Sequence, residues 1–233
     1  MKRILTAVIS TLIFCSCQTI TGSGNIITQI KNVSEFNGVK TSGSIDIEVM
    51  NNETESVKIE ADDNVLPYII VNVEAGLLNI HYKSGISFIN DHVKVFVSAP
   101  VFKKIFVAGS GGISSKGILK SGDTEIKISG SGDIDVAIDA PMVKADIKGS
   151  GTIIIKGKTK NFTAGISGSG DIKCRDLLSE NTSVIIAGSG TAHVFASVNL
   201  NATVSGSGDI FYSGNPTSPE THITGSGSVK AEK

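Results

Sequence analysis

The chain has 233 residues, which is enough for one large all-β unit or two small domains. It contains 26 glycines, 5 prolines and no tryptophan, and 18% of its residues are charged, a composition typical of a β-rich protein with many tight bends. The formal net charge is −1 and no basic stripe is visible, which argues against nucleic-acid binding.

The first residues have the pattern of an export signal. Two basic residues precede an apolar run of 11 residues, which is too short to span a bilayer. Ser16 before Cys17 resembles the lipobox of bacterial lipoproteins, whereas the bulky residue before Cys15 fits that pattern less well. We therefore expect residues 1–17 to be a lipoprotein signal peptide, with an ordinary secretory leader as the alternative. Acyl chains on Cys17 would anchor the protein to the outer membrane, on its periplasmic or cell-surface face.

Beyond the leader, the tripeptide Gly-Ser-Gly recurs with a period near nineteen residues. From residue 109 onward, successive copies start 21, 19, 19, 20, 18 and 19 residues apart. An earlier copy starts at Gly22, and a degenerate copy contains Gly43. We predict that the paired glycines form the corners of a repeating structure; these residues are Gly109, Gly111, Gly130, Gly132, Gly149, Gly151, Gly168, Gly170, Gly188, Gly190, Gly206, Gly208, Gly225 and Gly227.

Apolar and polar residues alternate on both sides of each motif, as in strands with one buried face. Both glycines fall on the predicted inner face, where a bend leaves no room for a Cβ, and glycine also permits a positive φ. The middle serine falls on the outer face, where stacked serine hydroxyls could bond to one another. In one copy the inward set would be Ile126, Ile128, Gly130, Gly132, Ile134 and Val136.

One such coil cannot be stable alone. Its buried apolar side chains contribute at most about 6–12 kcal/mol, whereas ordering its backbone costs at least about 19 kcal/mol. Because stacked coils share a core and hydrogen bonds, we predict an all-β fold, a right-handed parallel β-helix-like stack with coils of about 19 residues. This fold requires Ile128, Ile147 and Ile166 to occupy adjacent rungs.

The region before residue 108 is less regular. Turn signals separate strand-like runs, and the run after Glu74-Ala75-Gly76 is typical of a hairpin; these runs are 45–49, 57–59, 68–73, 77–82 and 93–97. We expect broader sheets here, which either cap the stack or form a first β domain. The predicted organisation is a signal peptide (1–17), a tether with the first Gly-Ser-Gly copy (18–34), an N-terminal β region (35–107) and the repeat β-helix (108–233).

These features together resemble the putative auto-transporter adhesin family with the head GIN domain. The resemblance extends over roughly residues 35–230 and is carried by residues 39–47, by Leu77-Leu78-Asn79-Ile80, by residues 93–100 and by the Gly-Ser-Gly-Asp-Ile units. It implies an all-β fold with β-helical coils in an exported bacterial protein. It implies no catalytic residues.

Aspartate follows the motif at Asp133, Asp171 and Asp209. Repetitive Gly-Asp turns can bind calcium, but the calcium-binding nonapeptide has half this period, and the other copies lack a carboxylate at this position. Too few oxygen ligands remain for a dedicated site, so we interpret these residues as polar bend residues. No metal or other cofactor is expected.

A polysaccharide-active enzyme is the alternative to a binding protein. A glycosidase needs two facing carboxylates about 5–10 Å apart, and two or more carboxylates converging in one groove would favour this alternative. The nearest acidic cluster is Asp133, Asp135, Asp139 and Asp146. Stacking would set a mixed column beside Asp135, made of Ile154, Lys173, His193, Phe211 and Lys230. We therefore expect no catalytic residues and no enzyme activity.

Histidine and cysteine offer no clear chemistry. The four histidines, His81, His92, His193 and His222, show no metal-ligand spacing, and the last two fall on the outward parity. Loss of Cys15 and acylation of Cys17 would leave Cys174 without a disulfide partner. Its column also holds Val136, Ile155 and Val194, so we expect a buried, inert thiol.

The sequence thus predicts a non-enzymatic cell-envelope lipoprotein, adhesin-like or scaffolding, that presents a repetitive β surface to a glycan or a protein. A lipid-binding or envelope-structural lipoprotein is a further alternative and would need a lined cavity. The final coil begins close to Val229 and has no obvious cap, which would expose a strand edge. We expect either end-to-end association into a homo-oligomer through this edge or a covering N-terminal segment.

Overall fold

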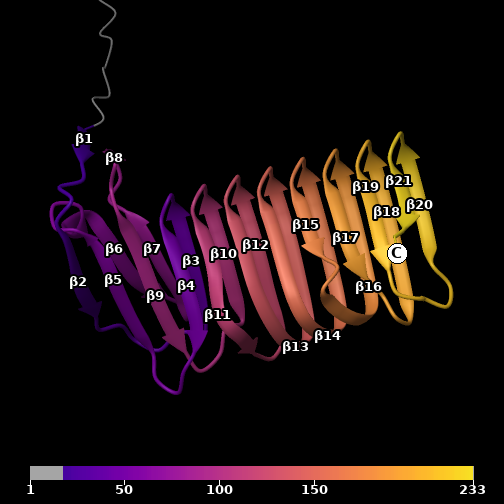
Figure 1. Ribbon diagram of the computed structural model, residues 1–233, viewed down its shortest axis with the longest axis horizontal. Helices are drawn as coiled ribbons and strands as arrows, with labels where there is room; N and C mark the ends of the chain where they lie inside the picture. The colour runs from indigo at the N-terminus through magenta and orange to yellow at the C-terminus, as the bar shows by residue number, and fades with distance from the viewer. Residues whose placement is uncertain (1–17, 233) are drawn as a thin grey trace, which may run out of the picture.

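In the computed structural model, which describes residues 18–232, the chain is a long stack of β-strands (Figure 1). Strands leading into the motif form one face: β3 (Gly38–Gly43), β10 (Lys104–Gly109), β12 (Thr124–Gly130), β16 (Leu177–Gly188), β18 (Asn199–Gly206) and β20 (Glu220–Gly225). Strands following it form the other face: β4 (Asp46–Asn51), β11 (Gly112–Lys120), β15 (Asp171–Cys174), β17 (Thr191–Phe195), β19 (Asp209–Ser213) and β21 (Ser228–Ala231). Two long strands contribute to both faces: β13 (Asp133–Gly149) and β14 (Thr152–Gly168).

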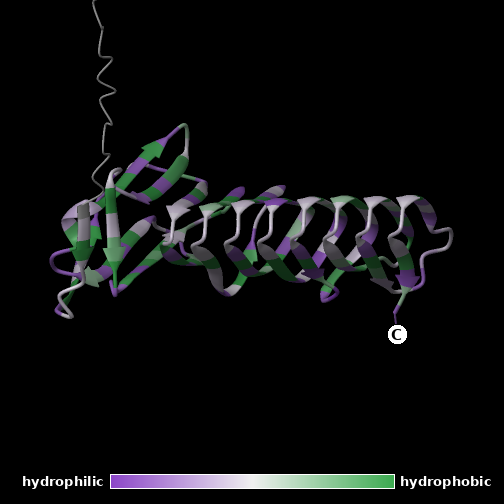
Figure 2. Ribbon diagram, turned by 90° about the horizontal axis from the view of Figure 1, so that it is seen from above, coloured by the Kyte–Doolittle hydropathy of each residue, from purple (hydrophilic) through white to green (hydrophobic). Residues whose placement is uncertain are grey.

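Successive coils pair in parallel with like residues in register. Ile128 lies opposite Ile147, and Ile147 lies opposite Ile166. Each of these side chains is at most 2% exposed, because the alternating apolar residues of both faces fill the space between them. Figure 2 shows the coils as a regular row along the long axis. The predicted all-β stack with coils of about 19 residues is therefore confirmed.

The Gly-Ser-Gly corners stack glycine on glycine. The first glycine of each copy from residue 109 onward has a φ between 125° and 138°. A Cβ on it would come within 2.2–2.5 Å of a carbonyl oxygen in the preceding coil. A Cβ on the second glycine would meet such an oxygen at 2.1–2.6 Å. At every corner, therefore, neither glycine of the motif can be replaced by a residue with a side chain without a steric clash.

The predicted ladder of serine hydroxyls is wrong. At each corner it is the serine N–H that donates to the preceding coil, as Ser131 does to the Gly109 carbonyl and Ser150 to the Gly130 carbonyl, both at 2.9 Å. The motif serine side chains are exposed, and within residues 18–232 their hydroxyls form no bonds to one another. The backbone already satisfies the bend, so the hydroxyls are left to water.

Irregular spacings are absorbed at the corner opposite the motif. The spacing of 21 after Gly109 arises from a register shift in β11 between Ser114 and Ile118, where the residues 115–117 bulge opposite Val136. The spacing of 20 after Gly168 arises from an extra residue between Cys174 and Leu177. The motif corner stays in register because insertions lie elsewhere.

The N-terminal region continues both faces and then ends them. β7 (Leu77–Tyr82) lies parallel to β3, and β9 (Val93–Ala99) lies parallel to β4. Antiparallel strands follow: β6 (Ile69–Glu74) on β7, β5 (Ser56–Asp62) on β9, and β2 (Ile26–Lys31) on β5. The predicted hairpin is the β6–β7 pair. A short 3-10 helix, η1 (Leu66–Tyr68), lies between β5 and β6. The broader sheets expected here cap the stack.

Residues 18–34, predicted as a tether, contribute two strands. β1 (Gln18–Thr21) pairs in parallel with β8 (Ile86–Ile89) as a separate ribbon, and β2 pairs antiparallel with β5 as the last strand of one face, with its side chains largely exposed. The Gly22 copy of the motif occupies no coil corner. Its loop is held instead by Asp62, whose Oδ1 accepts the Gly24 N–H at 2.7 Å.

Candidate functional site

A groove of about 620 Å³ lies on the outer face of β4, β11 and β13, beside the loop that follows β8. Its lining combines carboxylates with hydroxyls. The carboxylates are Asp46, Asp91, Asp133 and Asp135, and the hydroxyls belong to Ser44, Ser114 and Tyr82. The groove forms where the N-terminal cap meets the regular coils.

Strand register places two of these carboxylates two coils apart, with Gly112 between them. Asp46 Oδ1 accepts the Gly112 N–H at 2.8 Å, and Asp133 Oδ1 accepts the Thr152 N–H at 3.1 Å. Each carboxylate therefore holds the next coil with one oxygen. Because Gly112 has no side chain, the surface between the two carboxylates is hollowed.

The opposite wall of the groove comes from the cap. Tyr82 donates its hydroxyl to Asp91 Oδ2 at 2.6 Å, and its ring lies 4.5 Å from the ring of Phe88. Burial, reinforced by the neighbouring carboxylate of Asp91, raises the pKa of Tyr82 well above its usual range, so the phenol keeps its proton. The wall is therefore a fixed hydroxyl-carboxylate pair.

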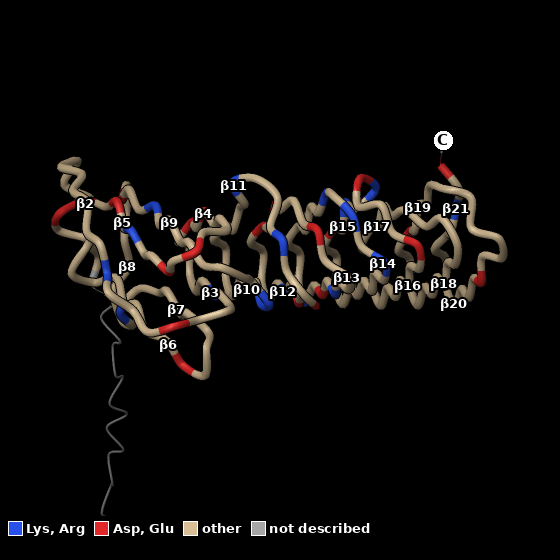
Figure 3. Tube along the Cα trace, turned by 90° about the horizontal axis from the view of Figure 1, so that it is seen from below, with Lys and Arg blue, Asp and Glu red and all other residues tan. Residues whose placement is uncertain are grey.

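The charge of the groove is predominantly negative. Lys94 also lines it, but its Nζ lies 3.6 Å from Glu48 Oε2. Asp135 has no hydrogen-bond or ion-pair partner within the described chain, which leaves its carboxylate open to a ligand. Elsewhere, basic and acidic segments alternate along the stack with no basic stripe (Figure 3). The groove is thus suited to neutral or cationic ligands rather than anions.

In the column of residues that contains Asp46, aspartates alternate with uncharged residues from coil to coil. In register it reads Asp46, Gly112, Asp133, Thr152, Asp171, Thr191, Asp209 and Ser228. Carboxylates thus occupy every second coil, about 9.6 Å apart at a strand spacing of about 4.8 Å. This separation avoids repulsion between neighbours and is too long for one ion to be shared. No cluster of three potential metal ligands occurs in residues 18–232.

The structure divides the predicted acidic cluster. Asp133 and Asp135 reach the groove, whereas Asp139 pairs with Lys158 at 3.3 Å near the opposite corner and Asp146 pairs with Lys144 on the other face. Sequence reasoning missed Asp46 and Asp91. Asp46 could have been found, since it follows Gly43 at the same offset as Asp133 follows Gly130.

The mixed column beside Asp135 is present as predicted. Asp135 lies opposite Ile154, followed by Lys173, His193, Phe211 and Lys230. His222 is exposed, but His193 is only partly so, because its ring stacks 4.9 Å from that of Phe211. Cys174 is buried, and burial raises the pKa of its thiol well above the usual value, which keeps it protonated and unreactive.

Cys17, the predicted lipid attachment point, lies outside the described residues. Between residues 18 and 232 the structure contains no helix of the length and apolarity needed to cross a bilayer.

Comparisons with solved structures find the same fold in proteins from Bacteroides and Parabacteroides species. A putative adhesin from Bacteroides fragilis is 22% identical with a TM-score of 0.88, and 91% of this chain and 100% of that chain are covered. A putative lipid binding protein from Parabacteroides distasonis is 26% identical with a TM-score of 0.80, covering 93% and 100%. A putative adhesin from the same organism is 26% identical with a TM-score of 0.74, covering 92% and 100%.

No curated protein is significantly similar to the chain. The family described as "Putative auto-transporter adhesin, head GIN domain" matches residues 35–216, a span that includes most of the cap, the groove and most of the coils. The resemblance seen in the sequence is thereby confirmed, and the chain belongs to the putative auto-transporter adhesin family with the head GIN domain.

Proposed function

We propose that this protein is a non-enzymatic, adhesin-like binding module of the cell envelope that holds a neutral, hydroxyl-rich glycan in the groove beside its cap. The lining of the groove carries the proposal, because carboxylates and hydroxyls converge around an open volume of about 620 Å³. Carboxylate oxygens accept hydrogen bonds from sugar hydroxyls. The same carboxylates repel anionic polymers, which gives selectivity.

Family membership supports a binding role and an exported or cell-surface location. Likeness to the Parabacteroides distasonis protein described as a putative adhesin supports the same role. The finer location, an outer-membrane lipoprotein acylated at Cys17, rests on the lipobox. Since β1 begins directly after Cys17, the groove would lie close to the membrane. Mass spectrometry of the membrane-extracted protein should find acyl chains on Cys17 and none in C17A.

A glycan array tests the ligand. The chain lacking residues 1–17, which retains the whole described fold, should bind neutral glycans and leave anionic ones unbound. Asp135→Ala should weaken binding about tenfold or more, since a hydrogen bond to a charged group contributes about 1.5–3 kcal/mol. Asp171→Ala is the matched control, because Asp171 lies outside the groove. Equal binding by both variants, or preferential binding of phospholipid vesicles, would contradict the proposal.

A polysaccharide-active enzyme is the second candidate, and the convergence of carboxylates in one groove favours it. Against it, three of the four carboxylates already accept hydrogen bonds from Gly112, Thr152 and Tyr82. Prolonged incubation with the glycans that bind decides between the two. Release of new reducing ends, lost in Asp135→Asn, would establish the enzyme and overturn the binding module.

A further inference from the structure

The last coil of the stack leaves a core position uncovered. Ile223 on β20 points inward in the same column as Ile186 and Val204. Those two side chains are fully buried, whereas Ile223 is 43% exposed. Every residue of β20 is exposed, because no described residue lies beyond it. An apolar core thus opens at this end between two strand edges.

The open edge of β21 carries unpaired backbone groups. Ser228 N–H donates to Gly208 O at 3.2 Å, and Glu232 N–H donates to Tyr212 O at 2.8 Å, both toward the preceding coil. Backbone groups alternate in direction along a strand, so the N–H and C=O of Val229 and Ala231 point the other way. They form a template for another strand.

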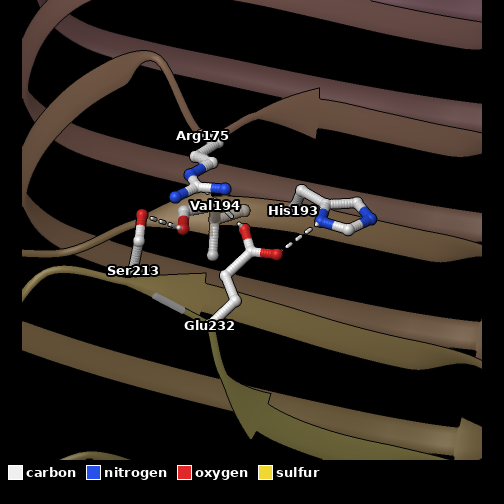
Figure 4. Close-up of polar contacts among 5 residues, drawn as sticks. All are labelled: Arg175, His193, Val194, Ser213 and Glu232. Carbon is white, nitrogen blue, oxygen red and sulfur yellow. Dashed lines mark hydrogen bonds and ion pairs between the residues drawn. The ribbon is translucent and has the colours of Figure 1, made fainter.

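The described C-terminal residues do not cover this edge. Glu232 is turned back along the outer face, where Oε2 lies 3.1 Å from His193 Nδ1 and Oε1 lies 3.9 Å from Arg175 Nε (Figure 4). The N-terminal segment does not cover it either, since β1 and β2 lie at the opposite end of the stack (Figure 1). The expectation of a covering N-terminal segment is wrong, because β1 and β2 pair with β8 and β5 of the cap.

The other end shows what closes such an edge in this fold. There both faces end in antiparallel strands, β6 on β7 on one face and β2 on β5, which itself pairs antiparallel with β9, on the other. A second copy, related by a two-fold axis perpendicular to the sheets, presents β20 and β21 running in the reverse direction. It therefore offers antiparallel strands to both faces at once, as the cap does.

We propose that two copies of this chain associate end to end, with β20 pairing antiparallel to β20 and β21 to β21 across a two-fold axis. The joined core buries Ile223 of each copy. Because a two-fold interface uses the same end of both copies, the assembly closes at two copies. The groove lies at the far end of each copy and remains open, so one dimer presents two grooves.

Analytical ultracentrifugation of the chain lacking residues 1–17 tests this proposal. The expected mass is that of a dimer. Ile223→Lys should give a monomer, because it sets two ammonium groups against each other in the joined core, while the lysine of a monomer can reach water through the open edge. Ile185→Lys, at an outward position that is 52% exposed, should remain dimeric. A monomeric parent chain, or equal effects of the two lysines, would overturn the proposal.

A backbone substitution provides an independent test. Ala231→Pro removes an N–H that points to the open edge and leaves the bonds from β21 to β19 in place, so the variant should fold and be monomeric. Ala231→Ser keeps the N–H and should remain dimeric. Circular dichroism checks that both variants are folded. Hydrogen exchange at Val229 and Ala231 should slow as the concentration of the parent chain rises, and exchange independent of concentration would contradict the pairing.

Discussion

The two ends of the stack treat the same core column differently. Ile80 on β7 and Ile223 on β20 both belong to the column that contains Ile128. Ile80 is fully buried because Val71 of the antiparallel strand β6 lies opposite it. Ile223 has no such neighbour and is 43% exposed. The repeating coil therefore fills its own core but does not cover its last strands. At the N-terminal end the antiparallel strands β2, β5 and β6 of the cap form that cover.

The comparison is tested most severely at two positive-φ glycines, Gly168 in a coil copy of the Gly-Ser-Gly motif and Gly24 in the cap copy. Gly168→Ala in the coils should cost about 4 kcal/mol, because a Cβ would lie 2.4 Å from the Gly149 oxygen at a φ of 129°. Gly24→Ala in the cap should cost only about 1 kcal/mol, since nothing lies within 4 Å of its Cβ and only the positive φ opposes it. Urea unfolding, monitored by the labelling of the buried Cys174 thiol as it becomes accessible, measures the loss of stability in both variants. Equal losses would contradict the difference.

The cap can be loosened by removing a buried carboxylate. Asp62 is 1% exposed and accepts the N–H groups of Gly24 and His92, each at 2.7 Å. Asp62→Ala should lower the free energy of unfolding by about 1.5–3 kcal/mol, because two hydrogen bonds to a buried charged group are lost. Asp63→Ala, at the exposed neighbour, should cost far less. A loss below about 1 kcal/mol for Asp62→Ala would argue against this role.

At the opposite end the corresponding contact is weak. Glu232→Ala should cost no more than about 1 kcal/mol, since its hydrogen bond with His193 and its ion pair with Arg175 are partly exposed. The change should appear as faster hydrogen exchange in β21 and leave β6 unaffected. Glu220→Ala, on the exposed strand β20, is the control. Destabilisation as large as that of Asp62→Ala would mean that the two ends are equally fixed.

The smallest expected effect is a response of the cap to acid. The hydrogen bond from Ser23, followed by that from Asn25, lowers the pKa of Asp63. A lowered pKa stabilises the fold above the unfolded value of about 3.9, and the contribution is lost as pH falls through the folded value. The protection of the Ser23 and Asn25 amides, relative to the intrinsic exchange rate at each pH, should therefore fall below about pH 4. The Asp63→Asn protein should show no such transition.

The coils could be predicted from the sequence because each repeats the same local requirement. Fixed spacing put Ile128, Ile147 and Ile166 in one column, and period-two alternation gave their direction. The cap could not be derived in this way, since its antiparallel pairs join unlike segments, such as β2 with β5 and β5 with β9. Pairing between strands of unrelated sequence leaves no periodic pattern in this part of the chain.

The same reasoning explains the errors at the motif and at the groove. The Gly22 copy matches in sequence but has no coil beneath it, so identity of a tripeptide does not fix its place. Asp133 and Asp135 were recognised as acids on one coil, but the groove also needs Asp91, which a loop of the cap brings in from outside the repeat. A site formed between a repeat and its boundary cannot be found in the repeat alone.

The alternation of aspartate along the outer face sets a rule for changes in length. Removal of the single coil that carries Thr152 would place Asp133 beside Asp171, with two carboxylates about 4.8 Å apart. Removal of two consecutive coils would restore the original neighbours. Duplication or loss of coils in this protein would therefore be tolerated best when two consecutive coils are added or removed together. The unit of such changes is twice the Gly-Ser-Gly repeat.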